Sequence, residues 1–256
     1  MKWMIISEKR AVGVLCGICF LAVAAMAAPN VLSEAVFSES RSIPIRSVQT
    51  TEKRVALTFD ADSDDLETRR LLEVLQRYQV KCTFFTVGAW AEKYPESIRA
   101  ITAQGHEIGN HSATHPHLSA LSRQQISAQM QSCSRSIQNA GGARPTLFRP
   151  PYGESESVVA QVARSLQMTC VLWNVDSMDW INLPPREISE RVVTQVEPGS
   201  IVLLHCGGAR NTASALPRIL KTLQSEGYEL VPVSQLLYPE PYAVTEAGVQ
   251  VPAIRR

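Results

Sequence analysis

The sequence predicts a single α/β domain built on a parallel sheet with crossover helices and closed into a barrel. From residue 54 onward, short runs rich in β-branched and aromatic residues alternate with amphipathic segments, which is the pattern of βαβ units. Neither GxGxxG nor GxxxxGK followed by Ser or Thr occurs in the chain, and these glycine motifs accompany many open nucleotide-binding sheets. Their absence favours a β/α barrel over an open, doubly wound sheet.

Seven β-rich runs predict the strands, and amphipathic segments between them predict the helices. The clearest helix start is Ser122, where Gln125 three residues later completes a capping-box pattern, and Gly141 and Gly142 end that helix. The predicted strands cover residues 55–59, 82–87, 107–109, 146–148, 169–175, 201–204 and 230–233. The predicted helices cover residues 66–78, 122–140, 158–167, 185–196 and 216–226.

The N-terminal 28 residues predict a signal peptide or a membrane anchor. Lys2, Lys9 and Arg10 precede a charge-free run of 18 residues, 11–28, that ends in small side chains. A run of this length also suffices to span a bilayer, so a cleaved signal and an uncleaved anchor both stay open. Either interpretation predicts an exported, extracytoplasmic protein, secreted or anchored at the cell envelope.

The rest of the chain divides into three predicted parts. Residues 29–52 are polar and rich in Ser, and we predict a short linker there. The predicted domain covers residues 53–238, with no internal repeat or interdomain linker. The tail at residues 239–256 is predicted to run extended over the domain.

Charge and cysteine content exclude several classes of protein. With 25 basic and 24 acidic residues, a net charge of +1 and no Lys/Arg-rich block, the chain lacks a nucleic-acid-binding footprint. Nothing in the sequence indicates a protein partner. Cys82, Cys133, Cys170 and Cys206 follow the apolar run without a CxxC pair, which argues against structural zinc and leaves disulfides or free thiols open. Cys206 is expected to point away from its neighbour His205, because adjacent strand residues face opposite sides.

Polar residues follow five of the predicted strands. In a β/α barrel the carboxyl ends of the strands meet on one face, which is where active sites form. Each residue alone is as readily a turn former or a structural hydrogen-bonding group, but their coincidence at strand ends favours an active site. His111 and His115 bring two imidazoles within reach of one cation if the segment is helical, whereas Pro116 is compatible with a simple loop. The strand-end residues are Asp60, His111, His115, Arg149, Asp176, Asp179 and His205.

Five short motifs in order resemble those of the polysaccharide deacetylases of carbohydrate esterase family 4, the NodB-homology domain. The motifs are Thr-Phe-Asp at 58–60, His-Ser-Ala-Thr-His at 111–115, Arg-Pro-Pro-Tyr-Gly at 149–153, Asp-Ser-Met-Asp-Trp at 176–180 and Leu-Leu-His at 203–205. The resemblance covers about residues 53–238. The fourth motif and the closing stretch 230–238 are most similar to the peptidoglycan deacetylases of spore-forming bacteria.

This resemblance implies a distorted seven-stranded β/α barrel that hydrolyses the N-acetyl group of amino sugars. The implied substrate is a polysaccharide, either peptidoglycan or an N-acetylglucosamine polymer, and acetate is released. A divalent metal is the implied cofactor, with Zn²⁺ expected and with His111 and His115 as ligands. Such a metal polarises the acetyl carbonyl and lowers the pKa of a water molecule.

The resemblance also implies roles for the remaining motif residues. Asp60 is the expected general base and is paired with Arg149, while His205 is the expected general acid and is held by Asp179. The backbone N–H of Tyr152 completes the oxyanion site.

Two further residues are expected to shape the substrate pocket. Leu203 and Trp180 wall the space for the acetyl methyl group.

The chain departs from the family pattern at one position. The family usually has Asp-Asp in the first motif, the second Asp being a metal ligand, but Ala61 follows Asp60 here. Asp62 is the candidate replacement ligand, whereas Asp64 and Asp65 are typical of helix caps. Two histidines with water, or Asp60 itself as the ligand, are the alternatives. The departure also leaves open an exported glycan-binding pseudoenzyme, and a chitooligosaccharide deacetylase is a further alternative within the family.

Overall fold

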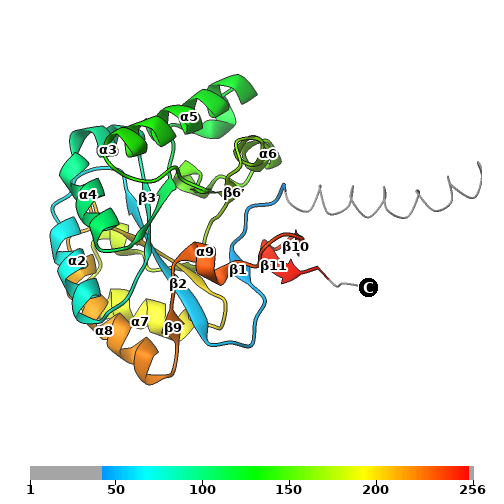
Figure 1. Cartoon of the computed structure of the whole chain (residues 1–256). Helices are drawn as coiled ribbons and strands as arrows, with labels where there is room; N and C mark the ends of the chain where they lie inside the picture. The colour runs from blue at the N-terminus through cyan, green and yellow to red at the C-terminus, as the bar shows by residue number, and fades with distance from the viewer. Residues whose placement is uncertain (1–41, 254–256) are drawn as a thin grey trace, which may run out of the picture. The chain divides into compact units, whose positions relative to one another are not determined.

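Residues 42–253 are described by the computed structural model, and their central element is a parallel β-sheet that confirms the predicted α/β fold (Figure 1). The sheet curls into a distorted barrel of seven strands, with β9 (Glu229–Leu230) added beside the start of β2. In sheet order the seven strands are β6 (Thr169–Cys170), β5 (Leu147–Phe148), β4 (Glu107–Asn110), β3 (Thr83–Thr86), β2 (Arg54–Ala61), β8 (Ile201–His205) and β7 (Val175–Asp176).

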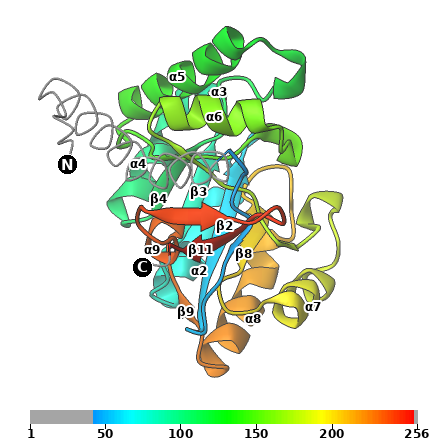
Figure 2. The same ribbon diagram turned by 90° about the vertical axis from the view of Figure 1, so that its right-hand side faces the viewer.

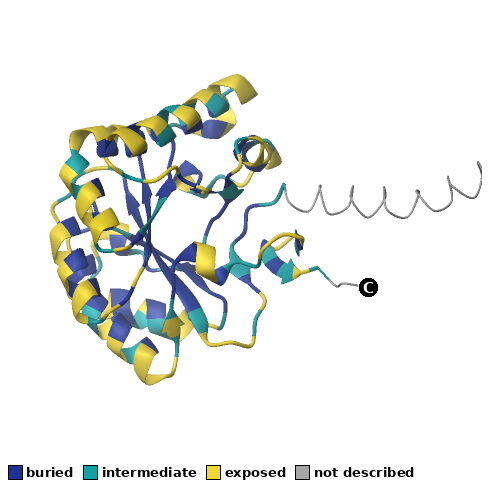
Figure 3. Ribbon diagram, viewed as in Figure 1, coloured by how far each residue is buried: buried dark blue, intermediate teal, exposed yellow. Residues whose placement is uncertain are grey.

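The helices cover the outer face of this sheet, with buried residues on the sides of the ribbons that face the strands and exposed residues on the sides that face away (Figure 3). All five predicted helices are present, and α5 begins with the predicted capping box: the Ser122 N–H donates to Gln125 Oε1 at 2.9 Å. The helices are α2 (Thr68–Arg77), α3 (Gly88–Lys93), α4 (Pro95–Ala103), α5 (Arg123–Asn139), α6 (Ser157–Ser165), α7 (Pro185–Gln195), α8 (Thr212–Ser225) and α9 (Val233–Leu236). Short 3₁₀ turns occur at η1 (Leu118–Ala120), η2 (Pro151–Gly153) and η3 (Asp179–Ile181).

The predicted strand at residues 169–175 is in fact two strands on opposite edges of the sheet. β6 pairs with β5, and β7 pairs with β8. Only four residues, 171–174, connect them, and an extended chain covers about 3.3–3.6 Å per residue. The two edges therefore face each other across a narrow gap, and the connection crosses it. The apolar residues 169–175 do not reveal such a crossing in the sequence. They are buried whether the whole run forms one strand or its middle only connects two strands.

Side-chain alternation along β2 and β8 separates the helix-facing side from the barrel interior. Leu57, Phe59 and Ala61 of β2 belong to the large apolar cluster that contacts the helices, and so does Cys206. Cys206 thus points away from His205, as predicted, and its thiol is free. The alternate residues, Thr58 and Asp60 on β2 and Leu203 and His205 on β8, face the interior.

Both ends of the described chain contribute to a small second sheet, which lies beside the barrel (Figure 2). Its strands are β1 (Ser47–Val48), β11 (Val249–Pro252) and β10 (Tyr242–Val244), in that order. β1 lies within the predicted linker, and β10 and β11 lie within the predicted tail. Residues 42–52 therefore belong partly to the folded unit, because their apolar side chains are buried against it.

Ile45 closes the gap at the edge of the barrel. Its side chain is 1% exposed, its N–H donates to the carbonyl of Cys170 at 2.9 Å, and its carbonyl accepts from the N–H of Leu172 at 2.7 Å. Within residues 42–253, β6 is an edge strand with no barrel strand on this side, and the N-terminal segment around Ile45 provides the hydrogen bonds there instead.

The signal or anchor predicted at residues 1–28 lies outside the described residues. Between residues 42 and 253, no helix combines the length and the hydropathy needed to cross a membrane.

We expect Ile45→Ala to lower the free energy of unfolding by about 2–4 kcal/mol, because it empties a buried site in the second apolar cluster. Leu66→Ala is the matched control, since Leu66 is 62% exposed, and a change within about 0.5 kcal/mol is expected there. Urea denaturation of both variants measures the difference. Equal losses in the two variants would contradict a closing role for Ile45.

Candidate active site

A cavity of about 430 Å³ opens at the carboxyl ends of the barrel strands. It brings together eight of the ten residues predicted for the site, and the other two, Arg149 and Asp179, lie directly behind it, fully buried. The lining residues are Asp60, Asp62, His111, His115, Pro150, Tyr152, Trp173, Asp176, Trp180, Leu203 and His205. The residues expected to meet at the strand ends therefore do lie together around one cavity.

Asp60 and Arg149 form a buried ion pair at the base of the cavity. Arg149 Nη1 donates to Asp60 Oδ1 at 2.7 Å, and Nη2 donates to the carbonyl of Leu172 at 3.2 Å. The guanidinium carbon lies 4.1 Å from the centre of the Phe85 ring, a cation–π contact. Burial opposes ionisation of Asp60, but the charge and hydrogen bond of Arg149 outweigh it and hold the pKa of this carboxyl below its ordinary value. Asp60 is therefore a carboxylate at neutral pH.

His205 is held by Asp179 on the opposite wall of the cavity. Its Nδ1 lies 2.7 Å from Asp179 Oδ1, and its backbone N–H donates to Oδ2 at 2.8 Å. Thr212 Oγ1 also donates to Oδ2, at 2.7 Å, which fixes the carboxylate. Burial of the imidazole lowers its pKa, but the hydrogen bond and charge of Asp179 dominate and raise the pKa of His205 to about 9. His205 is therefore protonated at neutral pH.

The two remaining imidazoles come from a loop, not from a helical turn. Ser112 and His115 both have positive φ, and the loop is tied down where the His115 N–H donates to Ser112 Oγ at 3.0 Å. The N–H groups of residues 113 and 114 donate to Gln129 Oε1 on α5. The loop alternative offered by Pro116 is thus correct, and it still brings the rings of His111 and His115 to 4.9 Å between centroids.

Both imidazoles have their Nε2 atoms near a carboxylate. His111 Nδ1 donates to the carbonyl of Arg149 at 2.7 Å, which leaves the Nε2 lone pair directed at Asp60 Oδ2, 3.6 Å away. His115 Nε2 lies 4.0 Å from Asp62 Oδ2. Burial lowers the pKa of both rings, and that of His115 falls to about 4. Both are therefore neutral imidazoles at pH 7, the form that binds metals.

The position of Ala61 clarifies the departure in the first motif. Ala61 is the last residue of β2 and faces the helices, so its methyl group lies in the apolar cluster and not in the cavity. Asp62 is two residues beyond Asp60 and lines the cavity with it. The cavity at this point is thus lined by the carboxylate of Asp62 and not by the side chain at position 61.

These residues fit a divalent cation in donor type. Two ligands bound to Zn²⁺ at about 2.0–2.2 Å with a tetrahedral angle lie about 3.4 Å apart. Among the expected ligands, His115 Nε2 and Asp62 Oδ2 are 4.0 Å apart, somewhat more than that value. Over residues 42–253, however, no three His, Cys, Asp or Glu side chains already stand as a closed ligand cluster. A cation bound by these residues would therefore require His115 and Asp62 to move closer together.

The mouth of the cavity is lined by residues predicted to contact substrate. Tyr152 and Trp180 are 58% and 52% exposed, so both side chains are accessible to a ligand. Leu203 is buried and forms part of the wall. Exposed aromatic rings beside an apolar wall and charged groups are typical of a site for a partly apolar, partly polar ligand.

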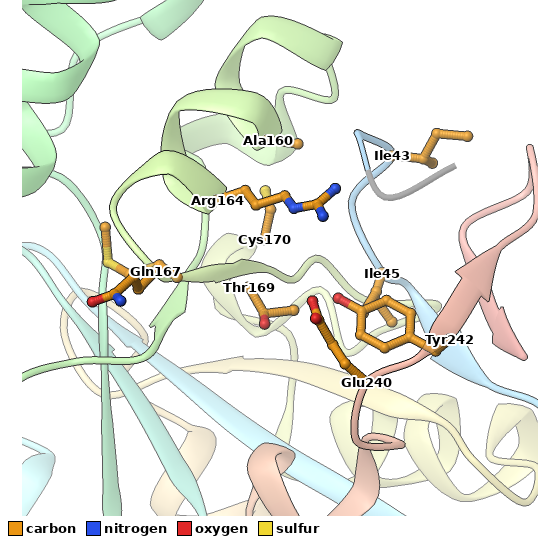
Figure 4. Close-up of a pocket in the computed structure, with 10 residues that line it drawn as sticks. Ile43, Ile45, Ala160, Arg164, Gln167, Thr169, Cys170, Glu240 and Tyr242 are labelled. Carbon is orange, nitrogen blue, oxygen red and sulfur yellow. The ribbon is translucent and has the colours of Figure 1, made fainter. Parts of the chain in front are cut away.

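A second cavity, of about 350 Å³, lies between α6, β6 and the C-terminal segment, where the side chains of Arg164, Glu240 and Tyr242 gather (Figure 4). It shares no lining residue with the first cavity. It lacks the paired carboxylate and imidazole groups, so the strand-end cavity is the candidate active site.

Comparison with known proteins agrees with this geometry. A sequence model of the family described as polysaccharide deacetylase matches residues 47–171. The peptidoglycan-N-acetylmuramic acid deacetylase PdaC of Bacillus subtilis is 36% identical over 190 residues, which are 74% of this chain and 40% of PdaC. A peptidoglycan-N-acetylglucosamine deacetylase of Bacillus cereus is 34% identical over 194 residues, which are 74% of this chain and 91% of that protein. The chain belongs to the polysaccharide deacetylase family.

The solved structures include a family member without activity. BA3943 of Bacillus anthracis, described as a CE4 family pseudoenzyme, is 33% identical with a TM-score of 0.72, over 75% of this chain and 68% of that one. The resemblance to carbohydrate esterase family 4 is thus confirmed by sequence and by fold. The chain spans only about two fifths of the length of PdaC.

Three residues of this deacetylase site have functions that sequence reasoning did not assign. Trp173 lines the cavity from the crossing segment 171–174. The sequence predicted one continuous strand there, which gave no reason to place Trp173 at the site. Asp176 also lines it, and its Oδ1 accepts the N–H of Met178 at 2.8 Å. Thr212 begins α8 and fixes Asp179. Only the polar position of Asp176 after an apolar run was a usable signal.

Stability should fall as pH rises through the folded-state pKa of His205. The pKa is raised from 6.5 to about 9, so the protonated imidazole stabilises the fold fully below pH 6.5, and this contribution is lost as pH approaches 9. The expected loss in free energy of unfolding is about 2–3 kcal/mol. Urea denaturation at pH 6 and pH 9.5, with His205→Gln as the control, measures it. An identical pH dependence in both proteins would rule out His205 as the source.

Proposed function

We propose that this protein hydrolyses the N-acetyl group of amino sugars in peptidoglycan and releases acetate. The observation that carries the proposal is a carboxylate, Asp60, and a protonated imidazole, His205, on the walls of one cavity. The names of PdaC and of the Bacillus cereus relative, each a peptidoglycan deacetylase, support the choice of substrate. They differ in the sugar, so both sugars belong in the test.

Asp60 has the position and charge of a general base. Amide hydrolysis begins when water attacks the acetyl carbonyl carbon, and the proton that water loses needs an acceptor. Asp60 Oδ2 faces the cavity, since Oδ1 is engaged by Arg149. Arg149 keeps the carboxylate ionised and fixes its orientation. The proposed oxyanion donor is the N–H of Tyr152 at the mouth.

His205 has the position and charge of a general acid. When the carbon–nitrogen bond breaks, the departing nitrogen must take up a proton, because an amide anion is a very poor leaving group. The Nδ1 atom of His205 is engaged by Asp179, so Nε2 is the atom that donates. The products are acetate and a free amine on the sugar.

The metal is proposed to be held by His111, His115 and Asp62. A divalent cation bound there, with Zn²⁺ as the expected ion, supplies a Lewis acid for the acetyl carbonyl and for the attacking water. His111 is oriented for this role by its hydrogen bond to the Arg149 carbonyl. Asp62 supplies the negative charge that neither imidazole carries.

The proposed location is outside the cytoplasm, on the basis of the export signal predicted at residues 1–28. Peptidoglycan lies in that compartment. Fractionation of cells that make the full chain tests this location, and recovery in the cytosol contradicts it.

A glycan-binding pseudoenzyme is the second candidate function. Ala61 in the first motif and the similarity to the BA3943 pseudoenzyme favour it. The intact set of Asp60, Arg149, Asp179 and His205 disfavours it, because a protein that only binds glycan does not require a paired base and acid. Turnover separates the two candidates, since both predict binding.

We expect the protein to release acetate from peptidoglycan fragments and N-acetylglucosamine oligomers in the presence of zinc. Asp60→Asn and His205→Ala should each lower kcat about 10²–10⁴-fold, the usual range for a general acid or base. Arg69→Ala, a control with a side chain 92% exposed on α2, should retain full activity. Binding of glycan by the folded wild type without any acetate would establish the pseudoenzyme instead.

The third metal ligand has a separate test. Asp62→Ala should weaken zinc binding at least about tenfold, since losses of 10–100-fold follow even from removing outer partners of metal ligands. Asp176→Ala is the matched control, because this carboxylate lines the same cavity but is engaged by the N–H of Met178. Calorimetric titration of zinc into each protein gives the affinities. Unchanged affinity in Asp62→Ala removes Asp62 from the metal site.

A further inference from the structure

A stacked pair of rings stands at the mouth of the cavity. The rings of His117 and Tyr152 lie with centroids 4.0 Å apart and planes 18° from parallel. They come from different loops, one after β4 and one after β5. The His117 side chain is 65% exposed and Tyr152 is 58% exposed, so burial alone does not hold them together.

Glu154 provides the contact that orients His117. Its side chain is only 10% exposed, and Oε1 lies 3.0 Å from His117 Nδ1. Ser119 donates to the same carboxylate twice, from its Oγ at 3.0 Å and its N–H at 2.9 Å. Burial opposes ionisation of Glu154, but these hydrogen bonds prevail and lower its pKa. The imidazole is therefore anchored to a fixed carboxylate, with Nδ1 as the donor.

Tyr152 needs such support because its backbone is strained. Its φ is +58°, in the left-handed region that costs an L-residue roughly 1–2 kcal/mol. Its hydroxyl donates to the carbonyl of His115 at 3.2 Å, and its ring meets the edge of the His115 ring at 4.6 Å between centroids. The rings of His117 and His115 thus both contact the Tyr152 ring. Fixing the ring fixes the peptide that precedes it.

We propose that Glu154 and His117 are positioning residues that hold the Tyr152 backbone at the oxyanion position. This inference rests on the proposed deacetylation, in which the Tyr152 N–H faces the developing negative charge. A displacement of about 1 Å at such a donor is enough to lower a rate up to 10²-fold. Neither residue touches the reacting atoms; both act through Tyr152.

The test separates kcat from KM for acetate release from N-acetylglucosamine oligomers. His117→Ala and Glu154→Ala should each lower kcat about tenfold and leave KM within about twofold. The double variant should lose no more than either single one, because both act through the same ring. His117→Phe keeps a stacking ring but loses the Nδ1 contact with Glu154, so its kcat should fall about as far as in Glu154→Ala. Arg69→Ala again serves as the unaffected control.

Two kinetic outcomes overturn the proposal. A rise in KM at constant kcat means that His117 contacts the sugar directly. Unchanged kcat and KM in both alanine variants mean that Tyr152 needs no support from this pair.

A second measurement does not depend on activity. The backbone ¹⁵N order parameters of Tyr152 and Gly153 should fall from about 0.85 to below about 0.6 in His117→Ala. Unchanged order parameters overturn the positioning role. If the wild type releases no acetate but the order parameters fall, the positioning holds and only the proposed deacetylation fails.

Discussion

The ion pair between Arg149 and Asp60 connects the fold with the site. A guanidinium with no solvent exposure carries a large desolvation cost, which only close partners offset. Asp60 at 2.7 Å, the carbonyl of Leu172 at 3.2 Å and the ring of Phe85 at 4.1 Å are those partners, and they come from three different segments. Because β5 and β2 are separated in the sheet by β4 and β3, Arg149 reaches Asp60 across the interior of the curled sheet.

The N-terminal segment around Ile45 also contributes to the surroundings of Arg149. The Leu172 carbonyl that accepts from Arg149 lies in the short crossing between β6 and β7, where no regular ladder fixes it. The Leu172 N–H donates to the carbonyl of Ile45, and the N–H of Ile45 donates to Cys170. The segment before β2 thus holds the crossing in place, and through it the environment of Arg149. This explains why part of the predicted linker is buried.

The sequence predicted the strand ends well because alternation and burial are local signals. Asp60 and His205 were expected to meet, and they are paired neighbours on β2 and β8. The crossing at residues 171–174 was not predictable from the local sequence. It exists because β6 pairs with β5 and β7 pairs with β8, and those partners lie elsewhere in the chain. Asp62 lines the cavity because β2 continues through Ala61. The sequence could not predict this, because the ends of strands are the least certain feature of a sequence pattern. The stacked loop residues, His117 and Tyr152, carry no periodic signal at all.

The proposed acid, His205, and the proposed base, Asp60, owe their charges to different partners in the same barrel. Asp60 is ionised because a buried Arg149 faces it, and His205 is protonated because Asp179 does. Each charge also favours the other, since the carboxylate and the imidazolium attract across the cavity. Ala61 lies outside this arrangement, on the helix side of β2. The substitution in the first motif therefore bears on the metal ligands, while the proton-transfer groups keep the charges that deacetylation requires.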